Sequence, residues 1–220
     1  PFAGVPLLLK DLGQCQKGEP STSGSRLFKN ILQTHQDTLV TKLEEAGFVI
    51  IGRTNTPEFG FKNMTEPSLW GVTSNPYDLS RNAGGSSGGT ASAVASGMVP
   101  IAMASDGGGS IRIPASFTGL IGLKPSRGRI PIGPNGYRGW QGASVNFALT
   151  KTVRDTRRLL EVLQVEQMES PFILPKLSKQ QLYASIERPL KIAVIEDSPI
   201  GNKVEDSAKK ALKRAVRFLQ

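Results

Sequence analysis

Several kinds of residue are scarce in this chain, and each scarcity excludes a class of protein. The 220 residues include one Cys and one His, which excludes a disulfide framework and a metal site built from several histidines. Aromatic residues make up 6% of the chain and do not alternate with Lys or Arg, as a nucleic-acid-binding platform would require. Apolar runs are far shorter than the roughly 20 residues of a membrane-spanning helix. We therefore expect neither nucleic acid nor a membrane as a direct partner.

Long runs of like charge are also absent. Lys and Arg number 27 against 18 Asp and Glu, which gives a formal net charge of +9, but the charge is spread along the chain. This distribution is typical of a solvated basic surface. Hydrophobic residues amount to 38%, enough for a buried core, and the length suits one large domain or part of a larger one.

The two ends of the sequence carry signals of their own. The chain begins with Pro1 rather than Met, and its last residues form an amphipathic pattern without a helix-ending residue. These features favour residues 1–220 as one partial domain of a longer protein. No charged segment followed by an apolar one opens the chain, so we expect a cytoplasmic location.

Glycine and proline, with 24 and 15 residues, are abundant and indicate many turns. Between the turns, short apolar runs alternate with helical patterns. Strands are predicted at residues 7–9, 48–52 (buried), 99–104 and 191–196, and helices at residues 26–46, 90–96, 153–164 and 204–220. This alternation predicts an α/β protein.

Two glycine- and serine-rich loops are the most distinctive motifs. The first reads G-G-S-S-G-G at residues 84–89, and the second reads G-G-G-S at residues 107–110, directly after a predicted strand. Glycines there let backbone N–H groups converge on a small volume, which suits a phosphate or the oxyanion of a reaction intermediate. Neither loop is followed by lysine as in a P-loop, and neither matches G-x-G-x-x-G. We therefore exclude phosphate and dinucleotide binding, and expect no cofactor and no metal.

The first loop also fits G-x-S-x-G, the pattern of the serine nucleophile in α/β-hydrolases. That pattern requires a preceding strand and a histidine later in the chain. Residues 78–83 are instead polar, and the only histidine, His35, comes earlier. A Ser-His-Asp hydrolase is therefore excluded.

A serine hydrolase without such a histidine needs another base, and lysine is the usual alternative. Lowering the pKa of a lysine by about three units costs roughly 4 kcal/mol, which burial can impose. Lys10 follows V-P-L-L-L, the most apolar approach to any lysine here, and Asp11 would point to the opposite face of a strand. Lys10 is therefore the best candidate for a base, the alternative being a strand-end lysine that reaches solvent.

Four motifs together resemble the amidase signature family. They read G-V-P-L-L-L-K-D, G-R-T-N-T-P-E-F, N-A-G-G-S-S-G-G-T-A and S-D-G-G-G-S-I-R-I-P-A-S, in this order. The resemblance covers most of residues 1–165 and extends more weakly to the end. It implies a mixed, twisted central sheet flanked by helices on both sides. Because family chains are much longer, it also implies that the N-terminal start and the C-terminal half are missing.

The resemblance assigns roles to individual residues. The family's catalytic lysine falls on Lys10, its cis-serine on Ser86 and its nucleophile on Ser110. Ser110 would attack an amide carbonyl while Ser86 passes the proton to neutral Lys10. The N–H groups of the second loop would form the oxyanion hole, at Gly107, Gly108, Gly109 and Ser110 itself.

Three further residues have a supporting role in this interpretation. Asp106 and Arg112 would brace the second loop, and Ser87 would support Ser86. Ordinary loop capping explains these residues almost as well.

The expected function is hydrolysis of a small-molecule carboxamide through an acyl-enzyme. The stretch K-P-S-R-G-R-I-P is similar to stand-alone bacterial amidases, including the 6-aminohexanoate cyclic dimer hydrolase type. The nucleophile loop lacks the Thr after Asp and the polar residue before Pro that are usual in the A subunit of glutamyl-tRNA(Gln)/aspartyl-tRNA(Asn) amidotransferase. That protein and a catalytically silent, self-associating fragment remain as alternatives. A homodimer is among the expected assemblies.

Overall fold

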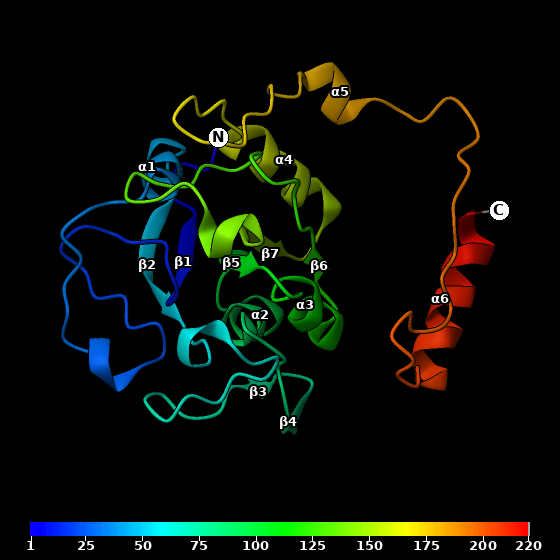
Figure 1. Cartoon of the computed structure of the whole chain (residues 1–220), viewed down its shortest axis with the longest axis horizontal. Helices are drawn as coiled ribbons and strands as arrows, with labels where there is room; N and C mark the ends of the chain where they lie inside the picture. The colour runs from blue at the N-terminus through cyan, green and yellow to red at the C-terminus, as the bar shows by residue number, and fades with distance from the viewer. Residues whose placement is uncertain (220) are drawn as a thin grey trace. The chain divides into compact units, whose positions relative to one another are not determined.

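A computed structural model describes residues 1–219, and the chain divides into two compact units, Pro1–Leu182 and a second that begins at Tyr183. The larger unit contains a five-stranded sheet built from β1 (Pro6–Lys10), β2 (Val49–Thr54), β5 (Ile101–Asp106), β6 (Ile121–Gly122) and β7 (Val145–Thr150). Their order across the sheet is β2-β1-β5-β7-β6 (Figure 1). β2 and β5 run parallel to β1, whereas β7 runs antiparallel to both β5 and β6. The sheet is therefore mixed, as predicted.

Helices cover both faces of this sheet. They are α1 (Thr38–Glu45), α2 (Gly88–Ala95), α3 (Arg112–Thr118) and α4 (Val153–Leu163). Leu7 and Leu9 of β1 belong to the core cluster that holds the buried leucines of α1 and α4, whereas Leu8 packs against the cluster formed by α2. Because side chains alternate across a strand, Leu8 points to the face opposite Leu7 and Leu9, so α2 lies on one face of the sheet and α1 and α4 lie on the other. The chain thus has the expected architecture, a mixed sheet flanked by helices on both faces.

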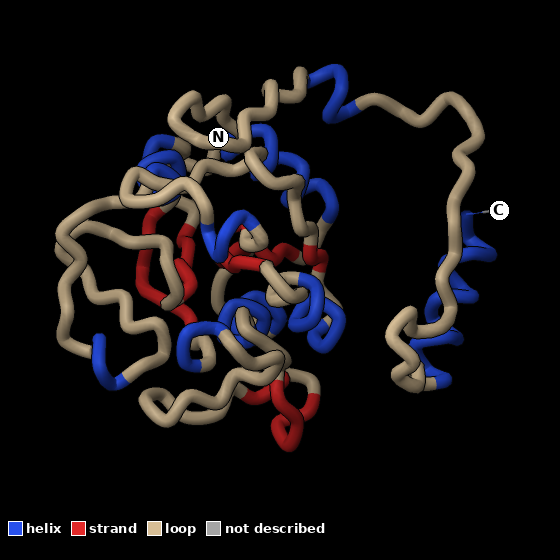
Figure 2. Tube along the Cα trace, viewed as in Figure 1, coloured by secondary structure: helices blue, strands red, loops and turns tan. Residues whose placement is uncertain are grey.

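Shorter elements and long loops connect these parts (Figure 2). They include the 3-10 turns η1 (Arg26–Phe28), η2 (Glu58–Gly60) and η3 (Gly139–Gly142), and the hairpin of β3 (Ser74–Asn75) and β4 (Asp78–Asn82). The strand β7 and the helix α3 were not predicted, because β7 follows a loop-like stretch and α3 is short and contains Pro114.

The predicted helix at residues 26–46 was wrong over its first half. The chain forms only a 3-10 turn at Arg26–Phe28 and a loop, and the helix begins at Thr38. Leu27 and Ile31, which suggested helical spacing, are exposed. Their spacing therefore does not report a buried helix face, and His35 lies in the loop rather than on a helix.

Two strand predictions also need correction. The strand at residues 48–52 exists as β2, but it is an edge strand, and Val49 and Ile51 are exposed rather than buried. Residues 191–196 form no strand, and their apolar side chains are exposed. A strand is stabilised by backbone pairing with a neighbour, and within the described residues this segment pairs with none.

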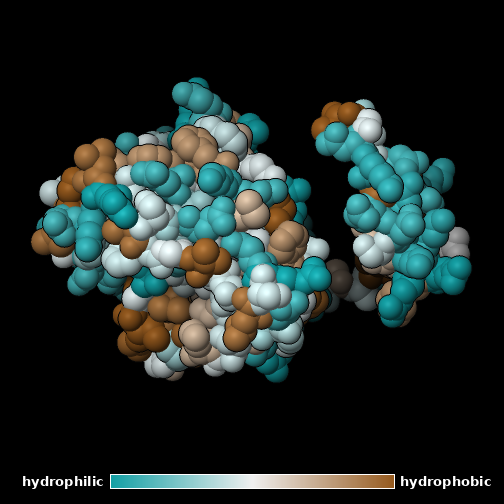
Figure 3. Space-filling model, turned by 90° about the horizontal axis from the view of Figure 1, so that it is seen from below, coloured by the Kyte–Doolittle hydropathy of each residue, from teal (hydrophilic) through white to brown (hydrophobic). Residues whose placement is uncertain are grey.

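The helix α5 (Lys179–Tyr183) spans the boundary between the units, and α6 (Asp206–Leu219) lies in the second. Within that unit, ion pairs join Lys209 to Asp197 and Lys213 to Glu196. In Figure 3 both units expose hydrophilic side chains together with apolar areas, and hydrophilic side chains predominate on the second. None of the helices in residues 1–219 is both long and apolar enough to cross a membrane.

Candidate active site

The site lies where two neighbouring parallel strands end. Lys10 is the last residue of β1, and Ser105 and Asp106 are the last residues of β5. The carboxyl ends of parallel strands meet at one edge of a sheet, which is where α/β proteins place their sites. The strand order therefore brings Lys10 and the second glycine loop together.

Lys10 is fully buried and has two serine partners. Its Nζ donates to Ser86 Oγ at 2.8 Å and to Ser105 Oγ at 3.0 Å. Burial lowers the pKa of Lys10 to about 7, although the Asp106 carboxylate raises it. Asp11 instead bonds to the backbone and side chain of Thr22. Lys10 is therefore buried, as expected of a lysine that could act as a base.

Hydrogen bonds restrain the backbone of the first loop on both sides of Ser86. The Gly85–Ser86 peptide bond is cis, as the family resemblance implied. Thr65 spans the loop, because its Oγ1 donates to Gly84 O at 2.8 Å and accepts from Gly88 N at 3.1 Å. Asn82 Oδ1 also accepts from Gly84 N at 2.9 Å.

Close packing explains why glycine occupies this loop. A Cβ on Gly85 would lie 2.8 Å from the Met64 backbone N, and one on Gly89 would overlap the Asn55 backbone N. Contacts that short exclude any side chain. The loop therefore fits only because its glycines let other backbone segments pack against it.

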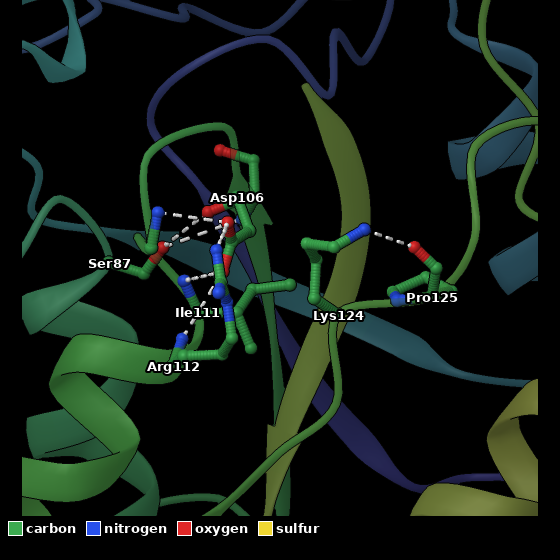
Figure 4. A network of polar contacts seen from close by, with 8 residues as sticks. Ser87, Asp106, Ile111, Arg112, Lys124 and Pro125 are labelled. Carbon is green, nitrogen blue, oxygen red and sulfur yellow. Dashed lines mark hydrogen bonds and ion pairs between the residues drawn. The ribbon is translucent and has the colours of Figure 1, made fainter. Parts of the chain in front are cut away.

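The second loop is held by one buried carboxylate, with Asp106 at the centre of the contacts in Figure 4. Asp106 accepts from the N–H groups of Gly109, Ile111 and Arg112 at 2.9, 3.1 and 3.3 Å. The Arg112 guanidinium adds two bonds of 2.9 Å. Burial alone raises the pKa of Asp106, but the bonds from Arg112 and the backbone outweigh it and lower the pKa overall. The geometry fits the bracing role expected for Asp106 and Arg112.

The members of the second loop differ in exposure. Ser110, Gly107 and Gly108 line a cavity of about 990 Å³, together with Ser86 and Ser105. Gly109 is buried, and its N–H already donates to Asp106. The hydrogen bond removes Gly109 from the expected oxyanion donors, since its N–H is directed at the brace. The N–H groups of Gly107, Gly108 and Ser110 remain as expected donors.

Ser105 was missed from the sequence, although it immediately precedes the Asp106 that was singled out. Its hydroxyl accepts from Lys10, and its backbone N–H and C=O both contact the Ser87 hydroxyl at 3.4 Å. Ser87 is fully buried at the start of α2. It thus supports the second serine partner of Lys10, rather than Ser86 as expected.

The cavity walls combine apolar and amide side chains. Apolar side chains come from Leu12, Phe59, Phe61, Met64, Ile113, Ile132 and Trp140, and amides from Gln14, Asn63, Asn135 and Asn146. Trp140 packs directly against the second loop, as a Cβ on Gly107 would overlap its ring. Away from these serines, one group of described side chains has the composition of a metal site, namely Cys15, His35 and Asp37.

Known proteins are similar to this chain in both sequence and structure. A family model described as Amidase matches residues 1–220. A lipoamidase from Enterococcus faecalis is 45% identical over 221 residues, which cover 100% of this chain and 28% of the lipoamidase. A solved structure of 6-aminohexanoate cyclic dimer hydrolase with its substrate has a TM-score of 0.93 at 38% identity, covering 100% of this chain and 47% of that one.

A third similar protein is the A subunit of the glutamyl-tRNA(Gln) amidotransferase of Thermotoga maritima. Its structure has a TM-score of 0.71 at 37% identity and covers 80% of this chain and 38% of that one. This chain therefore spans less than half the length of each of these relatives.

Proposed function

This chain belongs to the amidase signature family, and we propose that it carries the catalytic centre of a hydrolase that cleaves the C–N bond of a carboxamide. Ser110 is the nucleophile in this proposal, Ser86 the proton relay and Lys10 the base. Membership rests on the match of the family model to residues 1–220.

The observation that carries the proposal is the environment of Lys10. A lysine acts as a base only when it is neutral, and burial lowers the pKa of Lys10 to about 7. Its Nζ lies 2.8 Å from Ser86 Oγ, so a proton can pass between them directly. Ser86 and Ser110 face the same cavity, which gives the relay access to the nucleophile.

The chemistry follows from these positions. Ser110 Oγ forms a bond to the amide carbon while its proton passes to Ser86, whose own proton passes to Lys10. The N–H groups of Gly107, Gly108 and Ser110 stabilise the negative charge on the carbonyl oxygen. The C–N bond then breaks, the leaving amine takes a proton back through Ser86, and water releases the carboxylate from Ser110 by the same route.

The cavity walls indicate the substrate class. Apolar side chains dominate near Ser110, with amide groups between them, which suits a small molecule with an apolar chain or ring and a few polar groups. The lipoamidase and the cyclic dimer hydrolase are named for amide substrates of this general kind. We therefore propose a small-molecule amide as the substrate.

The alternative is the A subunit of a tRNA-dependent amidotransferase. A TM-score of 0.93 over the whole chain for the cyclic dimer hydrolase, against 0.71 over 80% for the amidotransferase protein, favours a stand-alone amidase. Copurification of partner subunits, or ammonia transfer to a charged tRNA, would reverse this preference.

The test is covalent labelling with a fluorophosphonate probe, followed by peptide mass mapping. We expect the adduct on Ser110, and weaker labelling in Lys10→Ala and Ser86→Ala. A folded chain, checked by circular dichroism and size-exclusion chromatography, that takes no adduct would support the alternative of a silent, self-associating fragment. An adduct on another serine would contradict the assignment.

A further inference from the structure

A second group of reactive side chains lies beside the catalytic cavity. The sulfur of Cys15, the imidazole of His35 and the carboxylate of Asp37 place one ligand atom each within 4.8 Å of one another. Cys15 follows β1, whereas the other two residues precede α1. All three are half-buried, so an ion from solvent can reach them.

The backbone holds two of these residues together. Asp37 N–H donates to Cys15 O at 2.8 Å, and Cys15 N–H donates to Asp37 Oδ2 at 2.9 Å. These reciprocal bonds fix two segments that are distant in sequence. The third residue is also near, since His35 Nε2 lies 3.4 Å from Asp37 Oδ1.

Asp37 is not used in the way its position suggests. It is the N-cap residue of α1, where an aspartate usually accepts from the first helical N–H groups. Its side chain makes no such capping bond. The carboxylate is directed instead at Cys15 and His35, so the N-terminus of α1 lacks a side-chain cap from Asp37.

The chemistry of the set matches a divalent cation of borderline softness. Zinc prefers thiolate, imidazole and carboxylate ligands in tetrahedral geometry, at about 2.3 Å for sulfur and about 2.0–2.2 Å for nitrogen and oxygen. Those distances require ligand atoms roughly 3.3–3.7 Å apart, so the present spread needs to close by only about 1 Å. One thiolate and one carboxylate would balance the charge of the ion.

The surrounding charges do not forbid such an ion. Arg53 is the nearby cation that interacts with Cys15 and Asp37, but it also faces the carboxylates of Asp11 and Glu19. Its guanidinium donates to Lys10 O at 3.2 Å and to Gln14 O at 3.1 Å. These bonds hold the guanidinium on backbone carbonyls.

We propose that Cys15, His35 and Asp37 form a zinc-binding site in the wall of the catalytic cavity, with water as the fourth ligand. Asp37 lines that cavity, as does Gln14, the neighbour of Cys15. Binding releases the thiol proton of Cys15 to solvent and forms a zinc–sulfur bond, with no change of oxidation state. The site does not depend on amide hydrolysis by Ser110.

The experiment is a titration of the untagged chain with Co²⁺, followed by displacement with Zn²⁺. Because the sequence holds one Cys and one His, a thiolate-to-cobalt absorption band can come only from Cys15, and a shifted imidazole NMR signal only from His35. We expect one equivalent of Co²⁺ to produce both signals and Zn²⁺ to remove the absorption band.

Conservative variants test the ligand set. Cys15→Ser should abolish the band, while His35→Gln and Asp37→Asn should each weaken Zn²⁺ binding about tenfold or more, since even outer-shell changes cost roughly 10–100-fold. Asp78→Asn on the exposed hairpin is the matched control and should bind like the unchanged chain.

Absence of a cobalt–thiolate band in the folded, reduced chain would overturn the proposal. So would a band that His35→Gln and Asp37→Asn leave unchanged, because cobalt would then be bound by Cys15 alone. His35→Gln keeps the test valid if Asp37→Asn unfolds, since no backbone hydrogen bond of this cluster involves the His35 side chain.

Discussion

The two glycine-serine loops have similar compositions and different surroundings. Every residue from Gly84 to Gly89 is buried, and the Thr65 side chain, from a separate segment, clamps that loop from outside. The loop at residues 107–110 is held by Asp106, next to it in the chain, and opens Gly107, Gly108 and Ser110 to the cavity. Glycine thus permits close packing in the first loop and access for a substrate in the second.

In the proposed mechanism, this contrast suits each serine to its role. Ser110 would face the substrate from a loop that Asp106 holds from the other side. Ser86 would relay a proton from a fixed position, which its burial next to Lys10 provides. Variants in the two loops should therefore fail in different ways.

We expect the greatest loss of activity from Ser110→Ala in the open loop. Loss of the nucleophile should reduce amide hydrolysis about 10⁴-fold or more, while the free energy of unfolding changes by less than about 0.5 kcal/mol because Ser110 faces the cavity. Steady-state kinetics and urea unfolding measure the two quantities. A stable variant that keeps substantial activity would show that Ser110 is not the nucleophile.

The next largest effect is the pH dependence of the reaction rate, which in the proposed mechanism comes from Lys10. Since burial lowers the pKa of Lys10 to about 7, the rate should fall roughly tenfold per unit below pH 7 and about 100-fold by pH 5. A rate profile over pH 5–9 measures this. A profile flat down to pH 5 would mean that Lys10 is not the base.

The free energy of unfolding should also depend on pH. The pKa of Lys10 is lower in the folded chain than its ordinary 10.5, so the unfolded chain binds more protons between about pH 7 and 10.5. Stability should therefore rise with pH across that window. Lys10→Met should remove this contribution in urea unfolding at several pH values.

A smaller effect on rate is expected from Asp106→Asn, which weakens the brace of the open loop. Asparagine cannot reproduce the paired bonds to Arg112, so we expect about 2 kcal/mol of lost stability and a rate lower by about tenfold to a hundredfold through misplaced oxyanion donors. Asp78→Asn, which breaks an exposed pair with Arg81, is the control and should change neither. Equal behaviour of the two variants would argue against the brace.

The least effect on rate should come from Thr65→Val in the clamp of the buried loop. The substitution removes the hydroxyl that joins Gly84 to Gly88, at a cost of about 1–3 kcal/mol. Thr65→Ser keeps the hydroxyl and should restore most of that stability. If valine is as stable as serine at this position, the clamp is not what holds the loop.

Local patterns predicted much of the fold. They failed where the structure of a segment depends on pairing or packing with distant segments. The strand before Lys10, the helix after the first loop and the strand before Asp106 were predicted because their periodicity is local. The segment 191–196 has the same apolar character, but it pairs with no strand among the described residues and stays exposed. The helix at residues 26–46 failed because exposed Leu27 and Ile31 imitated a buried face.

Contiguous motifs were sufficient to predict the family and the two loops, because each motif keeps its residues together in the chain. The catalytic roles of Ser110, Ser86 and Lys10 stay a prediction. The folded structure was needed to find that Ser105 contacts Lys10, that the Gly109 N–H serves Asp106, and that Cys15 and His35 meet at Asp37. Each of these contacts depends on where the folded chain places particular atoms. Such placement comes from the packing of whole strands and helices, which no local pattern of residues specifies.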